Sequence, residues 1–148
     1  MVNPFDLRTV LLAKHAQHVV LIHFPIALFI TGVGLDLLSR GKRESQLATA
    51  AYLNISLAAV TVIPAALTGL LAWQFALDGK RLKGLLLFHL LAASAATLLV
   101  LASWWVHRRS RKSGLPVLPV VRIFLELFGV VLIGLTAHLG GFLSGVNS

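Results

Sequence analysis

The chain has 148 residues, of which 57% are hydrophobic and 12% charged, and its mean hydropathy is +0.88. This composition is typical of an integral membrane protein and excludes a water-soluble domain. The formal net charge is +8, but the Lys and Arg residues stand in short runs between apolar stretches, so the charge indicates membrane topology and not nucleic-acid binding. The chain has no cysteine, which excludes disulfides, thiolate nucleophiles, cysteine-held iron–sulfur clusters and covalently attached haem.

Residues 1–17 are too polar to cross a bilayer. We expect a short helix there that lies on the membrane surface, because Asn3 can cap it and Pro4 suits its first helical position. Four apolar stretches follow, and each reaches the roughly 20 residues that a helical crossing needs. They cover about residues 18–38, 46–75, 83–106 and 120–146. We therefore predict an all-α, up-down-up-down membrane bundle of four helices, forming a single transmembrane domain over 1–148.

The first apolar stretch contains His18 and His23, and Pro25 stands two residues after His23. Proline has no backbone N–H, so the carbonyl of Leu21 loses its usual partner and we expect the helix to bend beside His23. Pro64 predicts a comparable defect in the second stretch.

The third stretch contains His89 and ends in Trp104 and Trp105, aromatic residues typical of a membrane boundary. The fourth stretch contains His138. Basic residues stay preferentially in the cytoplasm, and they are concentrated after the first and third stretches, at 40–43 and 107–112. These loops therefore predict that both chain termini are periplasmic.

Antiparallel threading places His23, His89 and His138 at one depth in the bilayer, roughly 7–11 Å below the outer boundary at the helical rise of 1.5 Å per residue. In a bundle with short loops the first and third helices face each other across the core, and the fourth touches both. An ionisable side chain inside a membrane is costly and is a functional hypothesis by default. Three imidazoles at one level predict a ligand set.

Small residues accompany two of these histidines. His89 shares a helical face with Ala92, Ala93 and Ala96, and His138 shares one with Gly134, Gly141 and Gly145. Such stripes are the usual means by which membrane helices approach closely. They would equally leave space for a flat macrocycle beside its ligands.

The run 18–28, His-Val-Val-Leu-Ile-His-Phe-Pro-Ile-Ala-Leu, resembles the opening signature of a bacterial four-helix membrane family of unknown function. The segments 68–73 (Thr-Gly-Leu-Leu-Ala-Trp) and 137–141 (Ala-His-Leu-Gly-Gly), together with His89, resemble its patterns in the other helices. Val19 stands where the family usually has proline, and Ala72 where it usually has an acid. The family is similar in architecture to haem b membrane cytochromes. The resemblance implies electron transfer in the bacterial inner membrane.

From the shared depth of the three histidines and from this resemblance, we predict a membrane b-type cytochrome subunit that binds one haem b. His23 and His89 are the favoured axial ligands, His138 is a substitute ligand or hydrogen-bonding partner, and His18 is either a solvated interfacial residue or a partner of a haem propionate. Two neutral imidazoles on the iron would favour electron transfer over oxygen activation. The expected partners are other subunits of a membrane redox complex, a quinone and a periplasmic c-type cytochrome.

A second polar group is expected near the cytoplasmic side, where Asp36, Arg122 and Glu126 lie towards helix ends with Asn54 at a similar depth. Ion pairs with residues one turn away explain most of this group. It could instead bound a quinone pocket or take up protons. His107, in the basic run, is expected to be solvated and to need no role.

Two other functions remain open from the sequence. The histidines could bind copper or zinc for transport or insertion, although Met1 is the only methionine and no thioether path leads to them. Alternatively, the protein could be a structural or pigment-holding accessory subunit whose histidines only form hydrogen bonds between helices.

Overall fold

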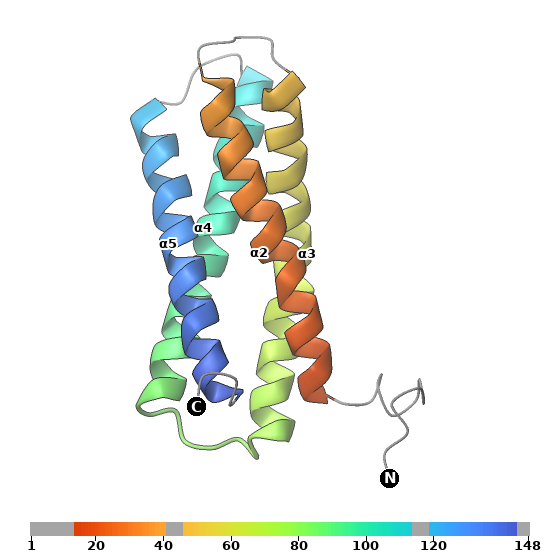
Figure 1. Ribbon diagram of the computed structural model, residues 1–148, viewed down its shortest axis with the longest axis vertical. Coiled ribbons are helices and arrows are strands. Elements are labelled where there is room, and N and C mark those ends of the chain that lie inside the picture. Colours follow the sequence, from red (N-terminus) through yellow and green to blue (C-terminus); the bar gives the residue numbers. More distant parts are fainter. Residues whose placement is uncertain (1–13, 41–45, 114–118, 145–148) are drawn as a thin grey trace.

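The computed structural model describes residues 14–40, 46–113 and 119–144. It contains four long helices, α2 (Lys14–Ser39), α3 (Gln46–Ala76), α4 (Leu85–Ser113) and α5 (Pro119–Leu143). They alternate in direction and form a bundle (Figure 1). Each contains a segment long and apolar enough to cross a membrane: Gln17–Ser39, Gln46–Phe75, Leu85–Lys112 and Val120–Leu143. The all-α four-helix prediction is confirmed. The surface helix predicted within residues 1–17 lies mostly outside the described residues, and residues 14–17 already belong to α2.

The bundle has two distinct ends. We call the end where α2 and α4 finish the basic end, because Arg40, Arg122 and the run 107–112 lie there. The other end carries the start of α2, the end of α5 and the 77–84 turn (Figure 1) and is called the terminal end. His18, His23, His89 and His138 all lie in the half of the bundle nearer the terminal end, as their positions along the four helices require.

Helix α4 is longer than the sequence predicted. It continues past Val106, through the whole basic run, to Ser113. No glycine or proline interrupts the chain until Gly114 and Pro116, so nothing in the basic run ends the helix. This extension keeps His107 on the bundle instead of in a loop.

The turn between α3 and α4 is closed by hydrogen bonds at the terminal end. Asp78 and Gly79 have φ of 52° and 59°, in the left-handed region that ends many helices. The amide of Gly79 donates to the carbonyl of Trp73 at 3.1 Å, and the Trp73 indole Nε1 donates to the carbonyl of Lys80 at 2.9 Å. The indole of Trp73 therefore helps to hold this turn.

The helices pack most closely around Phe29 in the middle of α2. The buried apolar cluster comprises Phe29, Val33, Ala58, Ala59, Val62, Ala96, Val100 and Ile133. Two glycines allow close approach. A Cβ on Gly32 would lie 2.7 Å from Cγ1 of Ile55, and a Cβ on Gly129 would lie 2.9 Å from Cε1 of Phe29. Small residues thus bring α2 against α3 and against α5, as membrane helices require.

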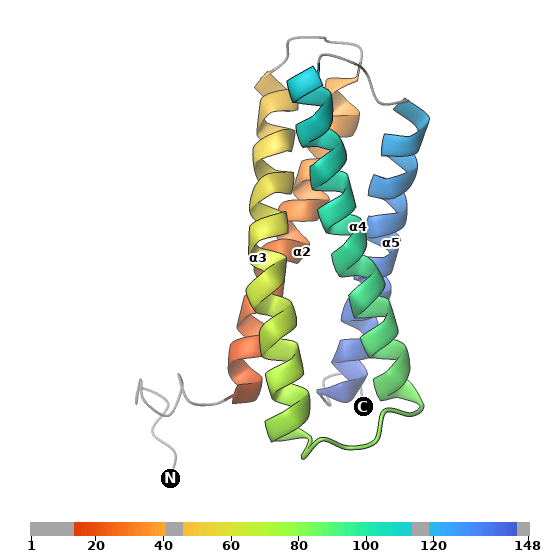
Figure 2. The same ribbon diagram turned by 180° about the vertical axis from the view of Figure 1, so that it is seen from behind.

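Packing is uneven along the bundle. The pairs α2/α3 and α4/α5 make the most extensive contacts, whereas α2 meets α5 over a short stretch. In α4 the buried residues fall between Ala96 and His107, and in α5 between Glu126 and Ile133. Among the described residues, none of α4 before Ala96 and none of α5 after Ile133 is buried. The α2/α3 pair and the α4/α5 pair therefore pack against each other tightly towards the basic end and loosely towards the terminal end. The ribbons of the two pairs diverge at the terminal end (Figures 1 and 2).

Candidate functional site

His23 lies on an exposed part of α2 and is oriented by its own helix. Its Nδ1 is 2.6 Å from the carbonyl oxygen of Val19. A carbonyl can only accept, so Nδ1 carries the proton and donates it, and the lone pair of the ring is left on Nε2. Metal-bound histidines are held in this way, with one ring nitrogen donating to a carbonyl and the other facing the metal. The ring of His23 is thus in the tautomer that a ligand needs.

His89 is half-buried on α4. Its Nδ1 is buried and makes no hydrogen bond of standard distance and angle to any described residue, although the backbone carbonyl of Thr136 on α5 lies close to the ring. The ring lies against α5, because a Cβ added to Gly140 would be 3.2 Å from its Cε1. A buried polar atom without a partner costs free energy, so this position fits a residue that binds a group from outside the chain. His23 and His89 lie on α2 and α4, and the ring of His89 faces α5.

His138 and His18 occupy different surroundings. His138 is exposed, and its ring meets Phe142, one turn away on α5, edge-on at 5.0 Å. His18 instead connects two helices, since its Nδ1 lies 3.1 Å from the carbonyl of Ala65 and 3.3 Å from Oγ1 of Thr68. A Cβ on Gly69 would approach Cε1 of His18 to 2.9 Å. His18 is thus a half-buried contact between α2 and α3 and not a solvated residue.

At the basic end the structure brings three of the four residues of the predicted second group together. Asp36 and Glu126 are buried, at 1% and 0% exposure. Arg122 pairs with Asp36 and lies 3.6 Å from Glu126. Arg40 spans both carboxylates, at 2.9 Å from Asp36 and 3.4 Å from Glu126. These contacts join α2 to α5, so the group is a connection between helices and not only the pairs one turn apart that the sequence predicted.

Asn54 does not join this group. Its side-chain amide donates to the carbonyl of Ala50 on its own helix at 2.9 Å. It lies beside Gly32, where the helices α2 and α3 cross, because a Cβ on Gly32 would be 3.2 Å from the Cβ of Asn54.

His107 completes the group and was missed at the sequence level. It is 4% exposed, and its Nε2 lies 2.6 Å from Oε1 of Glu126. One ligand atom from each of Asp36, His107 and Glu126 can be chosen so that all three lie within 4.8 Å of one another. The available signal was the absence of any helix breaker between Val106 and Ser113, which predicts that the helix continues through His107.

The five side chains at the basic end, Asp36, Arg40, His107, Arg122 and Glu126, are called the basic-end network. With His107 neutral, its two carboxylates and two guanidinium groups balance in charge. A divalent cation would have to displace an arginine, because both carboxylates already accept from guanidinium donors. The contact of His107 with Glu126 pairs an imidazole with a carboxylate, two groups that can each bind or release a proton. The network is suited to holding a proton more than a metal ion.

A family model described as "Predicted membrane protein (DUF2231)" matches residues 14–146. No curated protein and no solved structure matches the chain. The match covers all four helices and extends from the start of α2 to beyond the end of α5. The chain therefore belongs to the DUF2231 family of predicted membrane proteins.

Proposed function

We propose that this protein is a membrane b-type cytochrome subunit that carries one electron at a time between a quinol or membrane oxidoreductase and a periplasmic acceptor. His23 and His89 would hold the haem iron, with His138 as the substitute ligand. When bound, haem b would supply one-electron redox chemistry, and two imidazole ligands would leave no position for oxygen. The acceptor would be a c-type cytochrome or a neighbouring subunit.

The observation that carries the proposal is the state of the two imidazoles. His23 donates from Nδ1 to a carbonyl and keeps its Nε2 lone pair, while the buried Nδ1 of His89 makes no hydrogen bond of standard distance and angle to any described residue. Each imidazole thus has a ring nitrogen that could bind a metal. Both residues lie in the half of the bundle nearer the terminal end, His23 on α2 and His89 on α4. No thiolate or thioether in the described helices competes with them, because the chain has no cysteine and its one methionine is Met1.

The uneven packing of the bundle supports the same proposal. A haem needs space between helices, and no described residue of α4 or α5 is fully buried in the half that carries His89 and His138. His23 is exposed and the ring of His89 lies against Gly140, so binding one iron between them would require the two side chains to turn towards each other. Helix segments that bury few side chains can move at low cost, whereas the cluster around Phe29 fixes the other half.

A second function is favoured by one contact in the basic-end network. We propose that His107 and Glu126 form a proton-uptake site, because their polar atoms are 2.6 Å apart and shielded from solvent. A quinone is less well supported at this site, since Arg40 and Arg122 already bind the carboxylates that would face it. His107 and Glu126 lie at the basic end, away from the half of the bundle that carries His23 and His89, so this proposal stands separately from the haem proposal.

The visible spectrum of the full-length protein, purified in detergent, tests the first proposal. We expect split α and β bands that sharpen on reduction by dithionite, the signature of six-coordinate haem. Bound copper or zinc without such bands would indicate metal handling instead. A colourless protein free of metal would indicate a structural accessory role. Either of these two results would contradict the cytochrome proposal.

A further inference from the structure

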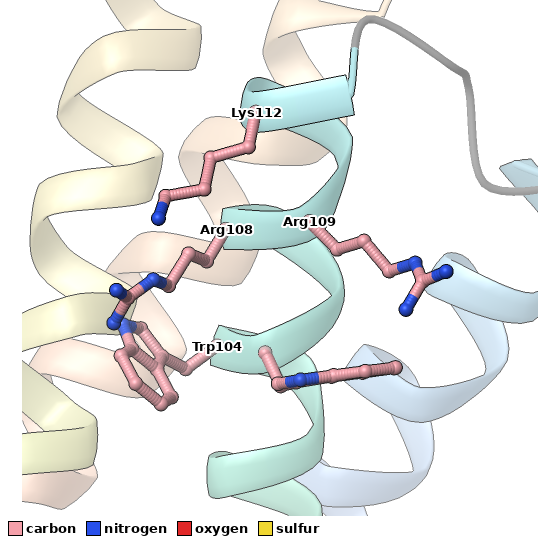
Figure 3. Close-up of a pocket in the computed structure, with 5 residues that line it drawn as sticks. Trp104, Arg108, Arg109 and Lys112 are labelled. Atoms are coloured by element: carbon pink, nitrogen blue, oxygen red, sulfur yellow. The ribbon is translucent and has the colours of Figure 1, made fainter.

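A cationic pocket lies on the surface of α4 at the basic end, separate from the histidines and from the basic-end network. It has a volume of about 600 Å³ and is lined by Trp104, Trp105, Arg108, Arg109 and Lys112. These residues form two columns at i, i+4 spacing, 104/108/112 and 105/109, which lie side by side on one face of the helix. In Figure 3 the side chains of Arg108 and Lys112 extend on the same side of α4, above Trp104.

Each guanidinium in the pocket is held over an indole. The Cζ of Arg108 lies 5.3 Å from the ring centre of Trp104, and that of Arg109 lies 5.3 Å from the ring centre of Trp105. Cation–π contacts at this distance are favourable and fix the height of the cation relative to the ring. Because tryptophan side chains sit at the membrane–water boundary, the two guanidinium groups are fixed at headgroup level.

The pocket carries more positive charge than the protein neutralises there. Helix α4 contains no acidic residue, and none of the ion pairs found among the described residues involves Arg108 or Lys112. Like charges at i and i+4 repel each other. The basic-end network is different, because Arg40 and Arg122 each meet carboxylates. An anion bound between Arg108 and Lys112 would relieve their repulsion.

An exposed apolar stripe runs from the pocket along the same helix towards the terminal end. It consists of Leu91, Leu98 and Trp105, at seven-residue spacing and with exposures of 57%, 67% and 54%. Seven residues are nearly two helical turns, so the three side chains follow one line. A cationic pocket at headgroup level matches the charged headgroup of an anionic phospholipid, and the apolar line below it matches an acyl chain.

We propose that this pocket binds the phosphate of an anionic membrane lipid, with one acyl chain lying along the Leu91–Leu98–Trp105 stripe. The partner is a lipid such as phosphatidylglycerol and not free phosphate, because only a lipid uses both the cations and the stripe. Basic pockets of membrane helices bind anionic headgroups by this chemistry. The inference stands independently of the haem proposal.

Quenching of tryptophan fluorescence by brominated lipids tests the proposal. The full-length Trp73→Phe protein in detergent reports only from Trp104 and Trp105, both of which line the pocket. Brominated phosphatidylglycerol is expected to quench in a saturable way, and unlabelled phosphatidylglycerol should reverse the quenching. Brominated phosphatidylcholine should quench weakly and without saturation. Millimolar inorganic phosphate should not displace the lipid, since it does not use the stripe.

Charge-neutral variants separate a site from general surface attraction. Arg108→Gln and Lys112→Gln should each weaken phosphatidylglycerol binding about five-fold, the effect of roughly 1 kcal/mol per basic residue near a membrane surface. Arg111→Gln is the matched control, because Arg111 is on the same turn but lies over Tyr52, at 4.7 Å from its ring centre. Equal losses in Arg108→Gln and Arg111→Gln, equal quenching by the two lipids, or displacement by phosphate would each overturn the proposal.

Discussion

The imidazole Nε2 of His107 and the carboxylate Oε1 of Glu126 lie 2.6 Å apart, and both residues are buried. They come from α4 and α5, so their contact joins two helices. Through Arg40, Glu126 is also connected to Asp36 on α2. A single carboxylate therefore connects charged or polar groups of three helices.

Replacement of Glu126 by glutamine should destabilise the bundle. It removes one of two carboxylates facing Arg40 and Arg122, and loss of one partner from a buried ionic group costs about 3–5 kcal/mol. We expect a clearly lower midpoint temperature for loss of the folded protein in detergent, measured by size exclusion after heating. Asp78→Asn is the matched control, because it makes the same chemical change at an exposed residue. Equal midpoints for the two variants would show that the network contributes nothing to stability.

Gly129→Ala tests the packing at Phe29. The new Cβ would lie 2.9 Å from Cε1 of Phe29, and overpacking of a core typically costs about 1–3 kcal/mol. Gly34→Ala is the control, because a Cβ there meets no atom within 4 Å, and alanine favours a helix over glycine by up to about 1 kcal/mol. The same melting experiment should therefore move the two variants in opposite directions. A Gly129→Ala protein as stable as Gly34→Ala would mean that α2 and α5 do not approach as described.

Trp73→Phe tests the turn between α3 and α4. The substitution keeps an aromatic ring and removes the donor to the Lys80 carbonyl, which costs about 1 kcal/mol for one hydrogen bond. Limited proteolysis should cut the 77–84 turn, at Lys80, Arg81 or Lys83, faster in this variant. Trp105→Phe is the control, since the Trp105 indole is on α4 at the opposite end. Identical cleavage rates would contradict a holding role for Trp73.

Hydropathy predicted the helices well, because the cost of burying backbone polar groups in lipid leaves an apolar segment of this length little choice but a helix. Depth counting also placed Asp36, Arg122 and Glu126 together. Rotation about each helix axis was not predictable in the same way. Asn54 has the right depth but bonds within α3, and His107 was assigned to a solvated run although α4 carries it into the bundle.

The same holds for the three membrane histidines: the sequence predicted their depth but not the direction of their rings. His23, His89 and His138 lie in the same half of the bundle, as predicted from the helical rise. The directions of their rings depend on side-chain packing that periodicity does not encode: His89 lies against Gly140, whereas His23 and His138 are exposed. Their roles as haem ligands remain a prediction.

The visible spectrum of ligand variants is the most direct test of the haem proposal. His23→Ala and His89→Ala should each insert into the membrane, because the apolar spans drive insertion, and each should lose the split bands of six-coordinate haem. His107→Gln should keep them, since His107 lies at the basic end. Loss in His138→Ala with retention in one of the first two would identify His138 as the substitute ligand. Unchanged bands in both His23→Ala and His89→Ala would contradict the assignment of these two residues to the iron.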